Sequence, residues 1–165
     1  MIFLGESIPY EYPVSEKTVP KICAEQFVEI MKKKGYKLNF SIESLENGID
    51  DILEKYSNIE GNDLSILIAF LTAYIGETLI RIFGGGWDGD FYGPLSRTGI
   101  NFYTSYIVIN DFRFNPNHFI SYYLGNGKKS EGTFYNYLYH RDKSKGLHSD
   151  FLGGGLINNI NNNIQ

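Results

Sequence analysis

A long apolar segment, residues 64–83, constrains the fold more than any other part of this chain. Its apolar side chains surround the helix that it predicts, and a helix that is apolar on nearly all sides has to be buried. Asp63 can cap the start of this helix, and the glycines from Gly84 onward can end it. Gly76 costs the helix about 1 kcal/mol relative to alanine, which predicts that another element approaches closely there. We therefore expect one long buried helix at the centre of the domain.

Two amphipathic helices are predicted before this central helix. Apolar residues recur at helical spacing over 22–31, and Gly35 is a natural stop. Ser41 or Ser44 can cap the second helix, whose apolar residues form a single stripe. Its other side chains are acidic, and we interpret them as a solvated face, with docking to a basic partner as the alternative. These acidic residues are Glu43, Glu46, Asp50, Asp51 and Glu54.

After the glycines, the pattern changes to short segments rich in aromatic and β-branched residues, which favour strands. We predict a three-stranded antiparallel meander over about 87–114, with Asn110 and Asp111 in its hairpin turn. Two C-terminal helices follow, the first from Pro116 and the second over about 130–140. The predicted fold class is therefore α+β.

The chain is long enough for one domain with a single core. We expect residues 1–147 to form this domain. Residues 148–165 are rich in glycine and asparagine, and we expect them to be a flexible tail.

Composition argues against several classes of function. The net charge of −4 is unlike that of a nucleic-acid-binding protein, which usually carries a basic field. Cys23 is the only cysteine, so neither an intrachain disulfide nor a multi-cysteine zinc site can form. The most apolar uncharged stretch, residues 64–76, is too short to span a bilayer, and the first residues do not form a convincing signal peptide. We therefore expect a cytoplasmic protein without a nucleic-acid or membrane partner.

The segment RIFGGGWDGDFYGP, residues 81–94, contains a G-x-G-x-x-G pattern at Gly84, Gly86 and Gly89. A dinucleotide fingerprint needs a strand before the glycines and a helix after them, so that the pyrophosphate meets the helix N-terminus. Here the order is reversed, and the helix end beside the glycines carries the negative end of the dipole. We interpret the glycines as a left-handed cap that ends the helix, and we expect no nucleotide or other cofactor.

The same segment carries a D-x-D pattern at Asp88 and Asp90. A calcium loop that begins at Asp88 needs oxygen ligands at its fifth and twelfth positions, which are Tyr92 and Gly99. We therefore predict no metal site, with weak cation binding as the alternative. The two aspartates share one face of a strand. Together with Tyr92 they form the surface that we predict to bind a partner, while Trp87 is expected to hold this strand to the central helix.

Glu77 is the most prominent polar residue of the central helix, and Arg81 follows it at a spacing that favours an ion pair. The alternative is an enzyme or small-ligand module that uses Glu77 in a pocket between the helix and the sheet. His118, His140 and His148 lie far away in the sequence, and no catalytic motif accompanies Glu77. We therefore expect a protein that is not an enzyme and has no catalytic residue.

Two stretches of the chain resemble small bacterial proteins of uncharacterised function. The first matches an S-x-E-S-L pattern, and the second matches Y-x-G-E followed by GGW. The similarity covers roughly residues 38–125. Some proteins that look like this are encoded near secreted toxins and are thought to be immunity proteins, so the resemblance implies a protein partner, namely a toxin. The matching residues are Ser41, Glu43, Ser44, Leu45, Tyr74, Gly76, Glu77, Gly85, Gly86 and Trp87.

Three hypotheses follow for what the chain does. The first is a non-catalytic, cytoplasmic protein-binding protein that acts as an immunity protein. The second is the ligand-binding or enzymatic module built around Glu77. The third is a subunit that associates with copies of itself through exposed strand edges, since the sequence leaves the oligomeric state open.

Overall fold

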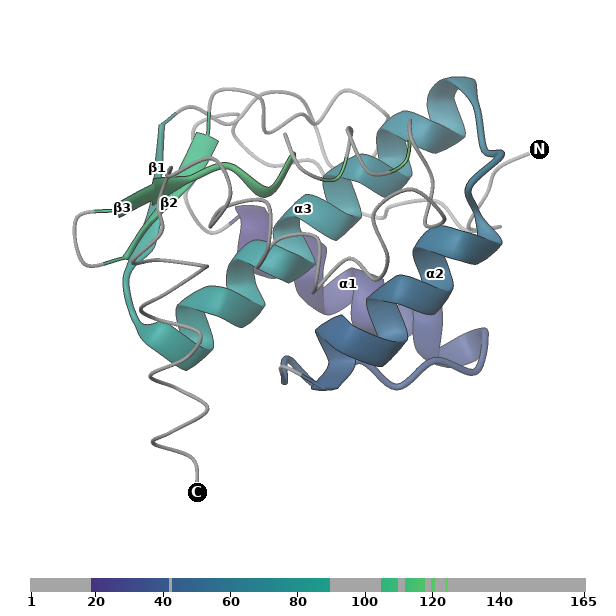
Figure 1. Ribbon diagram of the computed structural model, residues 1–165, viewed down its shortest axis with the longest axis horizontal. Coiled ribbons are helices and arrows are strands. Elements are labelled where there is room, and N and C mark those ends of the chain that lie inside the picture. Colours follow the sequence, from purple (N-terminus) through teal and green to yellow (C-terminus); the bar gives the residue numbers. More distant parts are fainter. Residues whose placement is uncertain are drawn as a thin grey trace, which may run out of the picture.

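The computed structural model describes residues 19–41, 43–89, 105–109 and 112–117, together with Ile120 and Leu124. In these residues the architecture is α+β, as predicted, with helices packed beside a small sheet (Figure 1). The elements in chain order are helix α1 (Val19–Lys33), a π-helix η1 (Ser44–Ile49) that continues into helix α2 (Asp50–Lys55), helix α3 (Gly61–Phe83), and strands β1 (Gly86–Gly89), β2 (Ser105–Ile109) and β3 (Phe112–Phe114).

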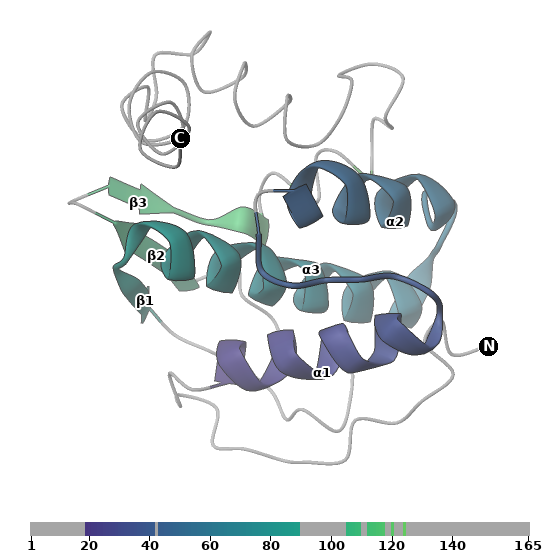
Figure 2. The same ribbon diagram turned by 90° about the horizontal axis from the view of Figure 1, so that it is seen from below.

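Helix α3 is the central element, and every residue from Leu71 to Leu79 in it is buried. Helix α1 packs along one side of it, while η1 and α2 lie along another side (Figure 2). Each buried large apolar side chain in such a core contributes about 1.5–3 kcal/mol. The prediction of a long buried helix is confirmed, although α3 begins at Gly61, so that Asp63 lies in its first turn instead of capping it.

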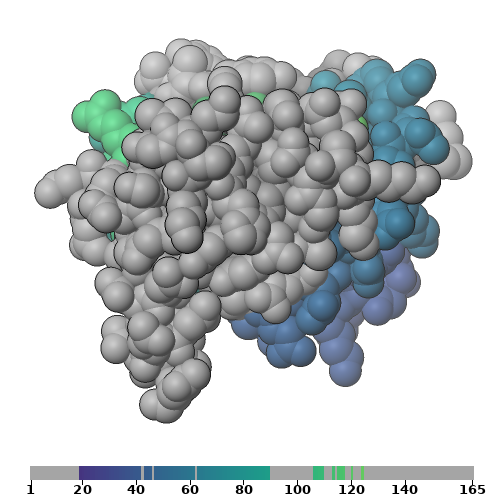
Figure 3. All heavy atoms as spheres, in the orientation of Figure 1, coloured from purple at the N-terminus to yellow at the C-terminus, as the bar shows by residue number. Residues whose placement is uncertain are grey.

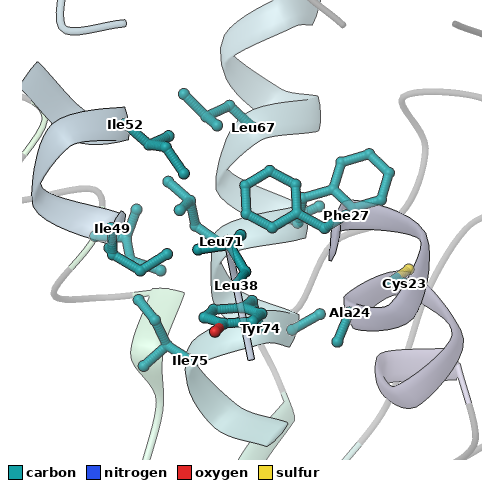
Figure 4. Close-up of a cluster of buried hydrophobic side chains, with 14 of the residues drawn as sticks. Cys23, Ala24, Phe27, Leu38, Ile49, Ile52, Leu67, Leu71, Tyr74 and Ile75 are labelled. Carbon is teal, nitrogen blue, oxygen red and sulfur yellow. The ribbon is translucent and has the colours of Figure 1, made fainter. Parts of the chain in front are cut away.

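The core is formed where the three helical segments meet (Figure 4). The rings of Phe27 from α1 and Phe70 from α3 stack with their centroids 5.5 Å apart. Ile49 and Ile52 approach α3 from the other side, beside Leu71 (Figure 4). The apolar faces read from the sequence therefore meet in one core.

Helix α3 is also long and apolar enough over Asp63–Phe83 to cross a membrane, judged by length and composition alone. The stretch exceeds the one considered from the sequence because it continues past Glu77 and Arg81. However, 67% of its most apolar window is buried inside the protein, as expected of a core helix.

The three described strands pair antiparallel in the order β1-β2-β3. Trp87 lies opposite Ile107, and both are buried, whereas the next pair along, Asp88 and Tyr106, lies on the opposite face. In a space-filling view the described sheet and helix residues reach the surface toward opposite ends of one face (Figure 3). Residues 90–104, which connect β1 to β2, and the predicted turn at 110–111 lie outside the described residues.

The C-terminal predictions fall almost wholly outside the described residues. Pro116, Asn117, Ile120 and Leu124 have helical conformation, consistent with the start of the first C-terminal helix. The second C-terminal helix, the domain limit at residue 147 and the tail 148–165 are not among the described residues.

The second predicted helix differs from the expected single α-helix, because its first part is the π-helix η1. In an α-helix, residues five apart are turned by about 140° from each other, whereas the i to i+5 bonding of a π-helix brings them to nearly the same side. Ser44 and Ile49 are therefore both buried. Ser41 is the capping residue, since its Oγ accepts a hydrogen bond from the Ser44 N–H at 3.1 Å.

The π-helix also corrects the prediction of a wholly solvated acidic face. Asp50 is only 2% exposed, because it lies five residues after the buried Leu45 and the π turn brings it to the same side. Glu43, Asp51 and Glu54 are exposed, as expected. The side chain of Glu46 is outside the described part of the chain.

Candidate functional site

Trp87 joins the sheet to the central helix. Its indole Nε1–H donates a hydrogen bond to Oε2 of Glu77 in α3, with the two atoms 2.9 Å apart. The ring lies over Gly76, where an added Cβ atom would overlap the Cζ2 and Cη2 atoms of the indole. Trp87 and Glu77 are both buried. The predictions of a close approach at Gly76 and of Trp87 as the anchor of the first strand are therefore confirmed.

The glycines between α3 and β1 end the helix, as predicted, but not with a left-handed cap. Gly84 has φ 84° and ψ −173°, a combination that is essentially restricted to glycine, and its N–H donates to the Ile80 carbonyl at 2.7 Å. Gly85 has φ 98°, and a Cβ there would overlap the Val108 carbonyl. The glycines therefore let β1 turn away from α3 and approach β2.

The predicted ion pair between Glu77 and Arg81 is wrong. Glu77 faces Trp87, whereas Arg81 is directed toward α1, where its Nη2 lies 3.8 Å from Oε1 of Glu25. The Arg81 guanidinium also lies 3.5 Å from the centre of the Phe40 ring. An exposed ion pair of this length contributes little by itself, so the stacking on Phe40 is the stronger part of this contact.

The opposite face of the sheet carries the predicted partner-binding residue Asp88. Tyr106 lies opposite Asp88 on β2 and donates a hydrogen bond from its hydroxyl to Oδ2 at 3.4 Å. Arg113 of β3 lies opposite Val108, with its guanidinium 5.0 Å from the centre of the Tyr106 ring. Asp88 and Arg113 are exposed, and Tyr106 and Val108 are half-buried. We call these four residues the outer sheet face.

Only part of the predicted partner-binding surface can be placed. Asp88 lies on the outer sheet face, while Asp90 and Tyr92 lie outside the described residues. The proximity of Asp88 to Tyr106 and Arg113 depends on the strand register, so it could not be predicted from the sequence. The segment "SYIVI" does not alternate apolar and polar residues, so the strand register, and not the sequence pattern, places Tyr106 and Val108 on one face.

A second polar cluster, which the sequence analysis missed, lies under the π-helix. The hydroxyl of the buried Tyr74 accepts a hydrogen bond from the Phe40 N–H at 3.0 Å and lies 2.6 Å from Oγ of Ser44. Ser44 donates its own hydroxyl proton to the Ser41 carbonyl, so the Tyr74 hydroxyl donates to Ser44. Burial raises the pKa of Tyr74 above its ordinary value, although the Phe40 N–H that donates to its oxygen opposes this rise.

This cluster holds a strained segment in place. Phe40 has φ 59°, in the left-handed region that residues other than glycine seldom occupy. Its N–H is bonded to Tyr74, and its ring lies between the Tyr74 ring, 5.0 Å away, and the Arg81 guanidinium. Since the cluster is buried, it can fix the link between α1 and η1 but does not offer a surface for a partner.

Within the described part of the chain, no group of three or more His, Cys, Asp or Glu side chains is placed to hold a metal ion. The chain matches no family model, and comparisons with curated proteins and with solved structures find no match. The resemblance to immunity proteins therefore stays a prediction, and the geometry of the site alone has to support a function.

Proposed function

We propose that this chain is a non-catalytic, cytoplasmic protein-binding protein whose partner is a bacterial toxin that it neutralises as an immunity protein. The observation that carries the proposal is the outer sheet face, where Asp88, Tyr106 and Arg113 lie together on three adjacent strands. The resemblance of the two sequence motifs to immunity proteins supplies the class of partner. The acidic net charge argues against a nucleic-acid partner.

The chemistry of the outer sheet face suits recognition of a folded protein. Tyrosine and arginine are enriched at protein interfaces, because each combines a broad contact area with hydrogen-bond donors. Asp88 and Arg113 have opposite charges and are both exposed, so a partner has to match their arrangement as well as their sign. Val108, half-buried beside them, adds an apolar contact.

For the fold, we propose that the described strands belong to a complete three-stranded meander and that two helices follow it. The antiparallel pairing of β2 with β3 and the helical conformation of Pro116 and Asn117 support this arrangement. In this proposal Asp90 and Tyr92 extend the partner-binding surface beyond β1.

Glu77 does not provide a second candidate function. Its buried carboxylate accepts the Trp87 hydrogen bond, which gives it a role in packing. None of the contacts described for Glu77 points to a ligand at this position, so we propose no catalytic role for it.

The proposal is tested by co-expression of the chain with secreted toxins encoded beside its gene, together with capture of partners from the native host. We expect Tyr106→Ala to abolish protection and to weaken capture about tenfold or more, because large aromatic side chains often dominate interfaces. Tyr36→Ala is the matched control, since Tyr36 is also half-buried but lies on the link after α1. A wild-type chain that captures no polypeptide and protects against no neighbouring toxin contradicts the proposal.

A further inference from the structure

We infer that Glu77 is a positioning residue for the outer sheet face, acting through Trp87 on Asp88, the next residue of β1. The inference rests on the proposed function for what the face binds. The arrangement of the face itself can be tested without a partner.

The backbone of β1 has little intrinsic preference for one orientation. The strand contains only four residues, of which two are glycines, and Gly84 and Gly85 precede it. Gly84, Gly85 and Gly89 all have positive φ. Because glycine is conformationally permissive, contacts with the rest of the protein have to fix how this short strand lies on α3.

Trp87 supplies the contact between β1 and α3. It is the only large apolar side chain in the strand, and its ring occupies the space left by the missing side chain of Gly76. The smooth surface at Gly76 allows close packing but does not by itself stop the ring from sliding or turning. The directional bond from the indole N–H to Glu77 sets the orientation, and burial strengthens it.

The orientation of Trp87 then determines where Asp88 lies. Successive side chains of a strand point to opposite faces, so β1 with Trp87 held against α3 has to present Asp88 outward. Asp88 is aligned with Tyr106 in this register, and their side chains are hydrogen-bonded. Movement of Trp87 would therefore shift Asp88 relative to Tyr106, although Glu77 itself does not reach the outer sheet face.

The test compares amide hydrogen exchange and NMR spectra of the full chain carrying Glu77→Ala, Glu77→Gln or Trp87→Phe. For Glu77→Ala we expect about tenfold faster exchange at Trp87 and Asp88, from loss of a buried hydrogen bond to a carboxylate. The indole N–H signal of the single tryptophan should move upfield, and the Asp88 and Tyr106 amide signals should shift. Trp87→Phe should accelerate exchange at the same residues. Glu77→Gln should keep exchange close to that of the wild type, because its amide oxygen still accepts the indole hydrogen bond.

Tyr74→Phe is the matched control, because it also removes buried hydrogen bonds from α3 but on the side that contacts η1. It should leave exchange at Trp87 and Asp88 within about twofold of the wild type. The inference is overturned if Glu77→Ala changes that exchange no more than this, or if Tyr74→Phe accelerates it equally. If Glu77→Ala does not fold, Trp87→Phe decides in the same way, since it also removes the hydrogen bond to Glu77.

Failure of this inference is distinguishable from failure of the proposed function. Exchange and NMR shifts are measured without a partner, so unchanged values at β1 overturn the positioning role alone. Capture of no polypeptide by the wild-type chain overturns the proposed function alone.

Discussion

At the scale of single residues, the polar side chains of α3 select the elements that pack on it. Tyr74 bonds to Ser44 and to the Phe40 backbone, and Glu77 bonds to Trp87. Four of these residues match the motifs by which the sequence resembles other bacterial proteins, namely Ser44, Tyr74, Glu77 and Trp87. Packing and hydrogen bonding therefore explain those motifs, which lie apart from the surface proposed to bind a partner.

Gly76 gives the sharpest prediction at this scale. Gly76→Ala should destabilise the chain by about 1–3 kcal/mol, because the new methyl group overlaps the Trp87 ring and outweighs the gain in helix propensity. In a Trp87→Ala background the same substitution should stabilise the chain by up to about 1 kcal/mol, since the overlap is gone. Urea unfolding of the wild type, the two single variants and the double variant gives both differences in the free energy of unfolding. Equal effects of Gly76→Ala in the two backgrounds would refute the contact.

At the scale of elements, the sequence predicted those features that depend on local pattern. The burial of α3, the reversed order of helix, glycines and strand, and the stop at Gly84 all follow from periodicity and backbone preference. The partner of Glu77 was misassigned because spacing within a helix identifies only neighbours such as Arg81, whereas Trp87 lies in the next element. The π-helix was missed because the apolar stripe fits an α-helix equally well, whereas the i to i+5 backbone bonding that defines a π-helix leaves no local pattern in the sequence.

The π-helix leads to a prediction about the deletion of single residues from this segment. Deletion of the exposed Asn47 should convert η1 to an α-helix in which Ser44 and Ile49 are four residues apart and still share a face. We expect this variant to fold with a free energy of unfolding within about 1 kcal/mol of the wild type. Deletion of the exposed Asp51 is the control, because it turns the start of α2 relative to the core and should cost more than about 2 kcal/mol. Circular dichroism and urea unfolding measure both effects, and a larger loss for the Asn47 deletion would contradict the prediction.

At the scale of the whole molecule, the residues that pack the sheet on α3 and the surface proposed to bind a partner lie on opposite faces of the sheet. Helices α1 and α2 lie beside the first part of α3, while the sheet lies toward the end of α3 where the chain leaves it (Figures 1 and 2). The anchor at Trp87 faces inward, and Asp88 faces outward from the next position of the same strand. One short strand therefore connects the core with the surface proposed to bind a partner, and changes in the two parts can be tested separately.

Attraction of the partner by the overall charge and recognition of the local arrangement of Asp88 and Arg113 should have different effects on binding. Asp88→Lys makes the chain less negative than its net charge of −4, and Arg113→Glu makes it more negative. If overall charge attracts the partner, the two variants should change affinity in opposite directions. We expect both to weaken binding about tenfold or more, because each removes one exposed group from a complementary contact.

Glu29→Lys makes the same charge change as Asp88→Lys on the exposed side of α1, so it should leave affinity nearly unchanged. The measurement is the dissociation constant of the captured partner for each variant, at low and at physiological salt. Stronger binding by either Asp88→Lys or Arg113→Glu, or equal weakening by Glu29→Lys, would show that the partner does not read the outer sheet face. Weakening by both variants with an unaffected control would assign recognition to Asp88 and Arg113 themselves, because only a local contact loses affinity when either sign of charge is reversed.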